Sequence, residues 1–425
     1  MITTLWVSFF ALLLLRVPIV FAMGVAGGLA LLVAGIPLSL LVQRMIASTD
    51  SFALLAVPFF ILTGELMEAG GISARLVRFA SSLVGRFRGG LGAVCVVTTT
   101  IFSGISGSSA ADASAVGSIL IPQMLRRGYS RPYAAALQAA AAVNGPIIPP
   151  SVLMIVYASI ANVSVGAMFL GGFIPGLIVA AGLLIGNYVW ARRAGYAAEE
   201  RAGLREVGTA TAGAGWGLLV PVIIMGGILS GMFTATESGA IAAVYSAGIA
   251  LFIYREIKLR DLRRIILKAV LTTAQVMIII AAAGIFGWLL AAAQFPTRAA
   301  STLIALTDNK WMAIFIVILF LLLIGCVMEI LAAAIILIPV LFPIAAHYGF
   351  DQVHFAVVMV IAMALGSVTP PVGVTLYITL GIAGSSIREV NPYIWYFVAI
   401  IVAVLVLVTV MPSTVLLLPR AFGLS

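Results

Sequence analysis

Charged side chains are scarce in this sequence: Asp, Glu, Lys and Arg make up 9% of its 425 residues, whereas hydrophobic residues make up 63%. The mean hydropathy is +1.23. A soluble globule needs more polar surface than this, so that class of protein is excluded. Apolar runs follow one another from Leu5 to Leu418, which indicates a protein that crosses a membrane many times.

Cysteine is nearly absent as well. Cys95 and Cys326 each stand alone in an apolar segment, which excludes a disulfide framework and a thiolate metal site. The sequence has no Walker A motif, so ATP is not the evident energy source. It also shows no nucleophile paired with a base, so nothing in it indicates an enzyme. The net charge is +9, but basic residues beside membrane spans reflect topology, and we assign no nucleic-acid partner.

Two segments, 90–125 and 311–346, are apolar but interrupted in the middle. Each leaves arms of about 13 to 16 residues, shorter than the ~20 that a helix needs to cross a bilayer. We therefore predict a re-entrant helical hairpin at each. Full spans are expected at 2–15, 17–35, 52–70, 132–162, 166–191, 215–233, 236–254, 270–293, 352–384 and 392–418.

The distribution of basic residues predicts the topology. Arg86 and Arg88 precede the first hairpin, and Arg126, Arg127 and Arg131 follow it. Basic residues gather on the cytoplasmic side, so both ends of this hairpin are expected there, and the ends of the second hairpin and both chain termini are expected outside. Two full crossings would give the same charge pattern, and the short arms favour the hairpin. Only four of the 23 basic residues then lie outside, namely Arg44, Arg298, Lys310 and Arg420.

Two sequence patterns occur twice. Asp112 in ADASAVGSILIP and Glu329 in MEILAAAIILIP each lie ten residues before the final proline. The pattern G-x-x-x-P-P occurs as GPIIPP at 145–150 and as GSVTPP at 366–371. The offsets, 217 and 221 residues, indicate two similar halves.

We place the first half at 1–200 and the second at 215–425, joined by a cytoplasmic linker at 201–214. Each half holds one hairpin and one broken helix, at 132–162 in the first half and at 352–384 in the second. With five full crossings per half, an odd number, the second half must be inverted relative to the first. The predicted fold is an all-α polytopic membrane protein built from two inverted repeats, as in many secondary transporters.

Two amphipathic basic stretches, 72–88 and 255–268, are predicted to be helices on the cytoplasmic interface. Glu65 and Glu68 are interpreted as interfacial residues of the span that contains them. Glu237 in FTATESG is typical of a helix start rather than of a ligand.

The G-x-x-x-P-P pattern breaks a helix, because proline lacks a backbone donor and glycine lets another backbone approach. Inside a bilayer the freed carbonyl and amide groups must be buried in protein or face a water-filled cavity. Carbonyls, hydroxyls and a carboxylate are oxygen ligands that suit a hard monovalent cation, so we predict two cation sites of similar build. The candidates are Ser103, Ser106, Ser108, Ser109, Asp112, Gly145 and Pro149 in the first half, and Gly325, Glu329, Gly366, Thr369 and Gly373 in the second.

Asp112 and Asn144 each have a second interpretation. Asp112 could act as an N-terminal cap or dipole partner of the helix that follows the break, although acids inside a membrane are costly and usually functional. Asn144 could contact a substrate or cap the half-helix. Opposed helix N-termini at the breaks would favour an anionic group on a substrate that lies between them.

Six motifs occur in order over nearly the whole chain: FSGISGSSAADASAVGSILIPQMLRRGY, GPIIPPS, FLGGFIPG, MFTATES, GCVMEI and GSVTPPVG. Together they resemble the large membrane subunit of tripartite ATP-independent periplasmic (TRAP) transporters, of the DctM/SiaM type. One motif departs from the family pattern, because GCVMEI carries Glu329 where many members carry Asp.

The resemblance implies a multi-pass importer in the bacterial inner membrane, driven by two or more sodium ions, in which a transport domain moves like an elevator against a scaffold. It implies two protein partners: a small four-helix membrane subunit, expected here as a separate chain, and a periplasmic substrate-binding protein. The substrate is expected to be an organic acid, of the C4-dicarboxylate or sialic acid type.

The resemblance also implies site residues, with the acids as direct ligands or as supports. The first sodium site would use Ser103, Ser106, Asp112, Gly145 and Pro149, and the second Gly325, Glu329, Gly366, Thr369 and Gly373. The substrate would lie between the hairpin tips and the breaks, near Ser108, Ser109, Asn144, Ser151, Pro371 and Thr375.

The nearest alternative keeps this fold and changes the coupling: a stand-alone carboxylate symporter or antiporter of the same superfamily, which needs no binding protein. An intramembrane enzyme would need a catalytic pair, whereas the acids of this chain are widely separated in the sequence. A channel is disfavoured, because paired hairpins at an inverted-repeat interface suit alternating access.

Overall fold

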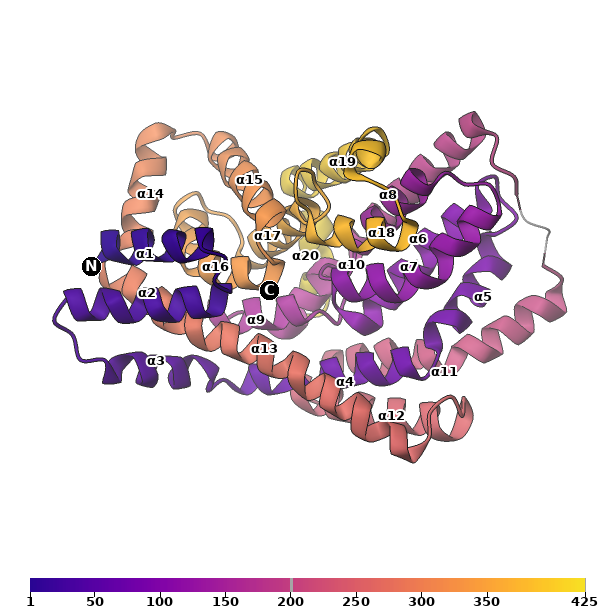
Figure 1. Ribbon diagram of the computed structural model, residues 1–425, viewed down its shortest axis with the longest axis horizontal. Helices are drawn as coiled ribbons and strands as arrows, with labels where there is room; N and C mark the ends of the chain where they lie inside the picture. The colour runs from indigo at the N-terminus through magenta and orange to yellow at the C-terminus, as the bar shows by residue number, and fades with distance from the viewer. Residues whose placement is uncertain (199–201, 425) are drawn as a thin grey trace.

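The computed structural model describes residues 1–198 and 202–424. In this part of the chain the regular structure is entirely helical, with twenty α-helices, one 3₁₀ segment and one π-helical segment. A helix satisfies its own backbone hydrogen bonds, which hydrocarbon surroundings require. Eight helical stretches are long and apolar enough to cross a membrane. The prediction of an all-α polytopic membrane protein is therefore confirmed (Figure 1).

One layer of the molecule, here named the framework, comes from the start and the middle of the chain. Its elements are α1 (Ile2–Leu14), α2 (Ile19–Val33), α3 (Ser39–Thr49), η1 (Phe52–Leu55), α4 (Ala56–Ala69), α5 (Ile72–Val84), α11 (Leu204–Leu229), α12 (Ala235–Gly248), η2 (Ile249–Ile253) and α13 (Leu259–Ala292). Helix α13 packs against α2, α3 and α4, and α12 packs against α4 and α11. Figure 1 shows α3, α13, α4 and α12 along its lower edge.

The second layer, here named the core, contains both predicted hairpins and both broken helices. Its elements are α6 (Gly90–Ser106), α7 (Ser109–Arg126), α8 (Arg131–Ala142), α9 (Val152–Ala161), α10 (Val165–Ala194), α14 (Phe295–Leu306), α15 (Lys310–Val327), α16 (Ile330–His347), α17 (Gln352–Gly366), α18 (Val374–Ala383), α19 (Ile387–Val410) and α20 (Ser413–Ala421). Helices α8 and α17 are the most enclosed, with every residue buried after the first one or two. The alanines of α8 allow α6, α7 and α18 to pack closely around it.

Each predicted hairpin is a pair of consecutive helices joined by two residues, but only the first pair packs closely, whereas α15 packs mainly against α17 and α16 against α9, α13 and α14. Helices α6 and α7 pack against each other and are separated by Gly107 and Ser108, and α15 is separated from α16 by Met328 and Glu329. The predicted arm lengths were wrong, because the arms have 17 or 18 residues. Helices α15 and α16 are each long enough to cross a membrane. Arm length therefore cannot distinguish a re-entrant hairpin from two full crossings, and the re-entrant form of the hairpins stays a prediction.

Both predicted helix breaks are present. Helix α8 ends at Ala142 and α9 begins at Val152, and α17 ends at Gly366 and α18 begins at Val374. The Pro149–Pro150 and Pro370–Pro371 bonds are both cis. The break between α8 and α9 is buried, whereas the break between α17 and α18 is partly exposed at Pro371 and Val374.

Helix α13 corrects one prediction. The basic stretch 255–268 is not a separate interfacial helix, because α13 runs without a break from Leu259 to Ala292. No proline interrupts this sequence, so the amphipathic stretch continues directly into the apolar one. In contrast, Ile72–Val84 does form a separate helix, and it packs against α6 and α11.

Several helix boundaries differ from the predicted ones. Helices α3 and α14 were not predicted, and α11 begins at Leu204, so the described part of the proposed linker 201–214 is mostly helical. The predicted boundary at residues 200 and 201 lies outside the described residues, and the division into halves stays a prediction. The last span is interrupted at Pro412, which separates α19 from α20. Glu237 starts α12 in a capping box with Thr234, as predicted.

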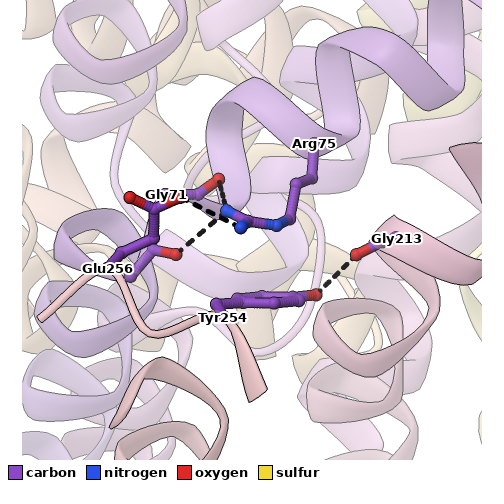
Figure 2. Close-up of polar contacts among 6 residues, drawn as sticks. Gly71, Arg75, Gly213, Tyr254 and Glu256 are labelled. Carbon is purple, nitrogen blue, oxygen red and sulfur yellow. Dashed lines mark hydrogen bonds and ion pairs between the residues drawn. The ribbon is translucent and has the colours of Figure 1, made fainter. Parts of the chain in front are cut away.

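A polar cluster fastens the start of α5 to other framework elements (Figure 2). The Arg75 guanidinium donates to Glu256 Oε1 over 3.0 Å and to the Gly71 carbonyl over 2.9 Å. It also lies 3.9 Å from the centre of the Tyr254 ring, and the Tyr254 hydroxyl donates to the Gly213 carbonyl over 2.8 Å. Helix α5 is followed in the chain by α6, so it connects the framework to the core. The polar cluster therefore anchors the framework end of this connection.

Candidate functional site

A cavity of about 360 Å³ lies where the framework meets the tips of both hairpins. Helices α4 and α13 form its framework wall, and the hairpin tips and the starts of α9 and α18 form the rest. Its polar lining residues are Glu65, Glu68, Ser106, Ser108, Ser109, Thr272, Gln275, Glu329, Ser367 and Thr375. The cavity thus joins residues from both halves of the sequence.

Four helices begin at this cavity. Their N-cap residues are Ser108 for α7, Ser151 for α9, Glu329 for α16 and Gly373 for α18. Residues from the first turn of each helix line the cavity. A helix N-terminus carries unpaired amide groups and a positive partial charge. The N-termini of α7, α9 and α18 therefore favour an anionic group, whereas the Glu329 carboxylate already occupies that of α16.

The first predicted cation site centres on Asp112, which is fully buried in α7. The Ser103 hydroxyl lies 2.5 Å from Asp112 Oδ2, and the Ser106 hydroxyl donates to Oδ1. Both serines belong to α6, so the carboxylate joins the two arms of the hairpin. It does not cap α7, because Ser108 occupies that position, but it stands in the first turn of that helix, where the dipole interpretation places it.

The first broken helix approaches this carboxylate closely. A Cβ atom placed on Gly145 would lie 2.9 Å from Asp112 Oδ2 and 2.5 Å from the backbone nitrogen of Ser109. The Pro149 carbonyl approaches α6, where a Cβ atom on Gly104 would lie 3.3 Å from it. The structure therefore brings Ser103, Ser106 and Gly145 to Asp112, while Pro149 reaches the same hairpin arm, α6, through its carbonyl.

Gln138 lies behind this site and was missed by the sequence analysis. Its Nε2 donates to the Asp112 backbone carbonyl over 3.0 Å, and its Oε1 accepts from Cys95 Sγ over 2.9 Å. Gln138 is fully buried in α8, so it holds α7 against α8 at the level of the carboxylate. A single amide within the alanine-rich segment YAAALQAAAA was the available signal.

Four of the five residues predicted for the second site also lie together. A Cβ atom on Gly366 would lie 2.8 Å from the Cα of Gly325, so α15 and α17 are in backbone contact there. The Gly373 amide donates to the Cys326 carbonyl over 3.0 Å, and Cys326 Sγ donates to the Thr369 carbonyl over 3.0 Å. The second break is thereby tied to the end of α15.

Glu329 occupies a different position from Asp112. Its carboxylate caps α16 by accepting from the Ala332 amide over 2.9 Å, and it lines the cavity. Helix α16 begins nine residues before Pro339, whereas α7 begins thirteen before Pro122. The two acids therefore match in sequence position but differ by one helical turn in their place on the helix.

The residues predicted to contact substrate divide into three groups. Ser108, Ser109 and Thr375 line the cavity. Asn144 and Ser151 are fully buried: Asn144 donates to the Thr100 hydroxyl over 3.1 Å, and Ser151 caps α9. The Asn144 Oδ1 has no hydrogen-bond partner within the described residues. Pro371 is exposed and is not among the residues that line the cavity.

The framework wall was not predicted. Glu65 and Glu68, interpreted as interfacial residues, line the cavity on α4. Thr272 and Gln275 line it on α13. Polar residues three or four positions apart within apolar spans were the available signal, but only the packing of α4 against α13 brings them to one surface.

Two electrostatic environments thus lie side by side. Helix N-termini suit an anion in the cavity, while the Asp112 carboxylate and the carbonyls at the helix breaks suit a hard cation. None of the ion pairs found in residues 1–198 and 202–424 involves Asp112 or Glu329. A buried carboxylate without a basic partner is costly unless it is protonated or binds a cation.

Sequence comparison identifies relatives of this chain. The family model described as the DctM component of tripartite ATP-independent periplasmic transporters matches residues 6–414. The Pseudomonas aeruginosa C4-dicarboxylate TRAP transporter large permease protein DctM is 39% identical over 410 residues, which cover 95% of each chain. The isethionate TRAP transporter permease protein DctMQ of Oleidesulfovibrio alaskensis is 38% identical over 409 residues; they cover 96% of this chain and 64% of that protein.

A solved structure shares the fold. The Alcanivorax borkumensis YdaH transporter superposes with a TM-score of 0.63 at 16% identity, covering 91% of this chain and 89% of that one. At this identity the similarity concerns the arrangement of helices only.

Proposed function

This chain belongs to the DctM-component family of tripartite ATP-independent periplasmic transporters, and from that premise we propose that it carries an organic acid anion into the cell together with sodium ions. It is a transport permease component of the bacterial inner membrane rather than an enzyme. The convergence of four helix N-termini on one cavity beside the buried Asp112 carboxylate carries the proposal.

The cavity is the proposed substrate site. The amide ends of α7, α9 and α18 would attract the anionic group, and the hydroxyls of Ser108, Ser109 and Thr375 would donate hydrogen bonds to it. Asn144, Ser151 and Pro371 do not line the cavity. We propose that Asn144 and Ser151 support the first break from behind and that Pro371 contributes through the shape of the second.

Two sodium sites are proposed beside the cavity. The first uses Asp112, Ser103 and Ser106 with carbonyls of the 145–149 backbone, and its carboxylate supplies the negative charge that would neutralise the ion. The second uses backbone oxygens near Gly325, Gly366 and Gly373 together with the Thr369 hydroxyl, while Glu329 would support it by capping α16. Sodium binding at these points would hold each hairpin against its broken helix.

We propose that the core moves relative to the framework as in an elevator. The cavity lies at the contact between the two layers, so sliding of one layer would move the site from one side of the membrane to the other. The Arg75 cluster would keep α5 attached to the framework during this motion.

The proposed partners are a small membrane subunit and a periplasmic binding protein, because the family is described as a tripartite periplasmic transporter of which this chain matches one component. The names of two relatives point to the substrate class: one is named for C4-dicarboxylates and the other for isethionate, which is a sulfonate. Both are small oxyanions. We propose a small organic acid, with a carboxylate as the recognised group.

Uptake by proteoliposomes tests the proposal. Succinate, N-acetylneuraminate and isethionate are first screened by thermal shift on the cognate binding protein, and the labelled anion that stabilises it is then supplied outside. We expect accumulation only with an inward sodium gradient and with the binding protein present. Accumulation without the binding protein would favour the alternative of a stand-alone carboxylate symporter or antiporter.

A further inference from the structure

Lys268 lies between two carboxylates where α4 and α13 meet. Its Nζ lies 2.7 Å from Glu65 Oε2 and 3.5 Å from Glu68 Oε2. The Glu65 side chain is only 15% exposed, whereas the side chains of Glu68 and Lys268 are 38% and 59% exposed. This charge cluster, here named the rim cluster, therefore extends from the protein interior to its surface.

The rim cluster adjoins the central cavity. Glu65 and Glu68 both line it. On α13, Thr272 and Gln275 follow Lys268 by four and seven residues, on the same helix face, and they also line it. Lys268 belongs to the basic stretch of α13, which the charge distribution places at the cytoplasmic side. The rim cluster thus lies at the edge of the proposed substrate site that faces the predicted cytoplasmic side.

The charges of the rim cluster do not cancel. Two carboxylates and one ammonium leave a net charge of −1, and loss of Lys268 would leave −2 beside a site that favours anions. An ion that passes one helical turn from these residues is about 6 Å from their charges. The Debye length at physiological ionic strength is about 8 Å, so the charges still act on that ion. An anion that passes the rim cluster therefore depends on Lys268 to offset Glu65 and Glu68.

We propose that Lys268, Glu65 and Glu68 set the charge selectivity of the cavity opening, with Lys268 as the residue that lets anions pass. This inference rests on the proposed function, because the cavity is taken as the anion site. It assigns a specificity role to the framework wall, in addition to the hairpin tips and the helix breaks. Lys268 acts on the passing anion through its charge.

Thiol modification measures this selectivity without any transported substrate. Thr272→Cys is introduced together with Cys95→Ser and Cys326→Ser, and the purified protein is labelled with a sulfonate-bearing or a trimethylammonium-bearing methanethiosulfonate. The ratio of the two rates reports the local potential. In 0.1 M salt we expect Lys268→Gln to lower the anionic-to-cationic ratio roughly threefold, and Glu65→Gln with Glu68→Gln to raise it by at least as much.

Three controls separate charge from structure. Lys268→Arg keeps the charge and should keep the ratio. In 1 M salt, where screening acts within about 3 Å, the differences should largely disappear. Ala47→Cys is the control position, because Ala47 lines a second cavity beside Trp288. The neighbouring Ser48 contacts Ile280 of α13, which lies about 18 Å along that helix from Lys268. The ratio of labelling rates at Ala47→Cys should therefore not change in the Lys268 and Glu65/Glu68 variants.

The outcomes are distinct. Opposite shifts in the lysine and glutamate variants support the inference, even if sodium-driven uptake later fails. Ratios that stay within about 1.5-fold of the parent in both variants would overturn it, even if uptake is sodium-driven. A shift of the same sign in both variants, or one that persists in 1 M salt, would also overturn it, because a charge effect must change sign and be screened.

Discussion

The Ser103 hydroxyl lies 2.5 Å from Asp112 Oδ2 and so links the two arms of the first hairpin through a fully buried carboxylate. The same carboxylate faces the first helix break at Gly145. One group therefore holds the hairpin tip together and supplies the negative charge of the proposed cation site. Its two roles can be separated by substitution.

Asp112→Asn should weaken sodium binding while keeping the hairpin folded, because the amide retains an oxygen acceptor but loses the charge. We expect the sodium concentration that gives half-maximal thermal stabilisation to rise about tenfold or more, equivalent to at least about 1.4 kcal/mol. Thermal unfolding of the purified protein at a series of sodium concentrations measures this. Asp112→Glu, which keeps the charge, is the matched control. An unchanged sodium dependence in the Asn variant would remove Asp112 from the site.

Gly366→Ala should force α15 and α17 apart, because the new Cβ would lie 2.8 Å from the Gly325 Cα and 2.7 Å from the Leu322 carbonyl oxygen. Backbone atoms cannot rotate away, so we expect a loss of about 1–3 kcal/mol in stability together with weaker sodium stabilisation. Gly381→Ala in α18 is the control, since its Cβ meets nothing within 4 Å. Equal unfolding temperatures for the two variants would contradict the close contact.

Glu329→Ala should lower the stability by about 1 kcal/mol, because it removes the N-cap of α16. Glu329→Gln keeps an oxygen that can accept from the Ala332 amide, so we expect most of the stability to return. If the carboxylate acts only through the cap, sodium-dependent stabilisation of the Gln variant stays within about threefold of the parent, a difference of under about 0.7 kcal/mol. A loss as large as that of Asp112→Asn would instead make Glu329 a direct ligand.

Arg75→Ala should destabilise the framework end of α5, because one guanidinium bonds Glu256 and Gly71 and stacks on Tyr254. We expect a cost of about 1 kcal/mol. Arg75→Lys should recover only part of it, since an ammonium lacks the planar fork. Arg78→Ala, at an exposed position of the same helix, should leave the unfolding temperature unchanged. A drop of equal size there would point to a general effect of charge on α5.

The sequence predicted the parts of the site that depend on local chemistry. Gly145 and Pro149 mark one break and Gly366 and Pro371 the other, because proline and glycine impose their effects on the backbone wherever they occur. Asp112 stood out because acids are rare in such surroundings. These signals need no knowledge of tertiary contacts.

The remaining features depend on packing between distant segments. Glu65 and Glu68 looked interfacial because nothing in their span shows that α13 lies beside them. Gln138 looked like one polar residue among alanines until α7 was seen to place the Asp112 carbonyl against it. Asp112 and Glu329 have the same spacing from proline, but α7 and α16 begin at different distances from it. Glu329 is therefore the N-cap of its helix, whereas Asp112 lies about one turn inside its own.

The coupling of sodium to anion movement is the central claim, and simultaneous flux measurement tests it most directly. Proteoliposomes that contain this chain with its small subunit and binding protein are given labelled sodium and the labelled anion that stabilises the binding protein. We predict that the anion stimulates sodium entry in the parent protein and that Asp112→Asn abolishes this stimulation. Anion accumulation with no accompanying sodium entry would contradict the account.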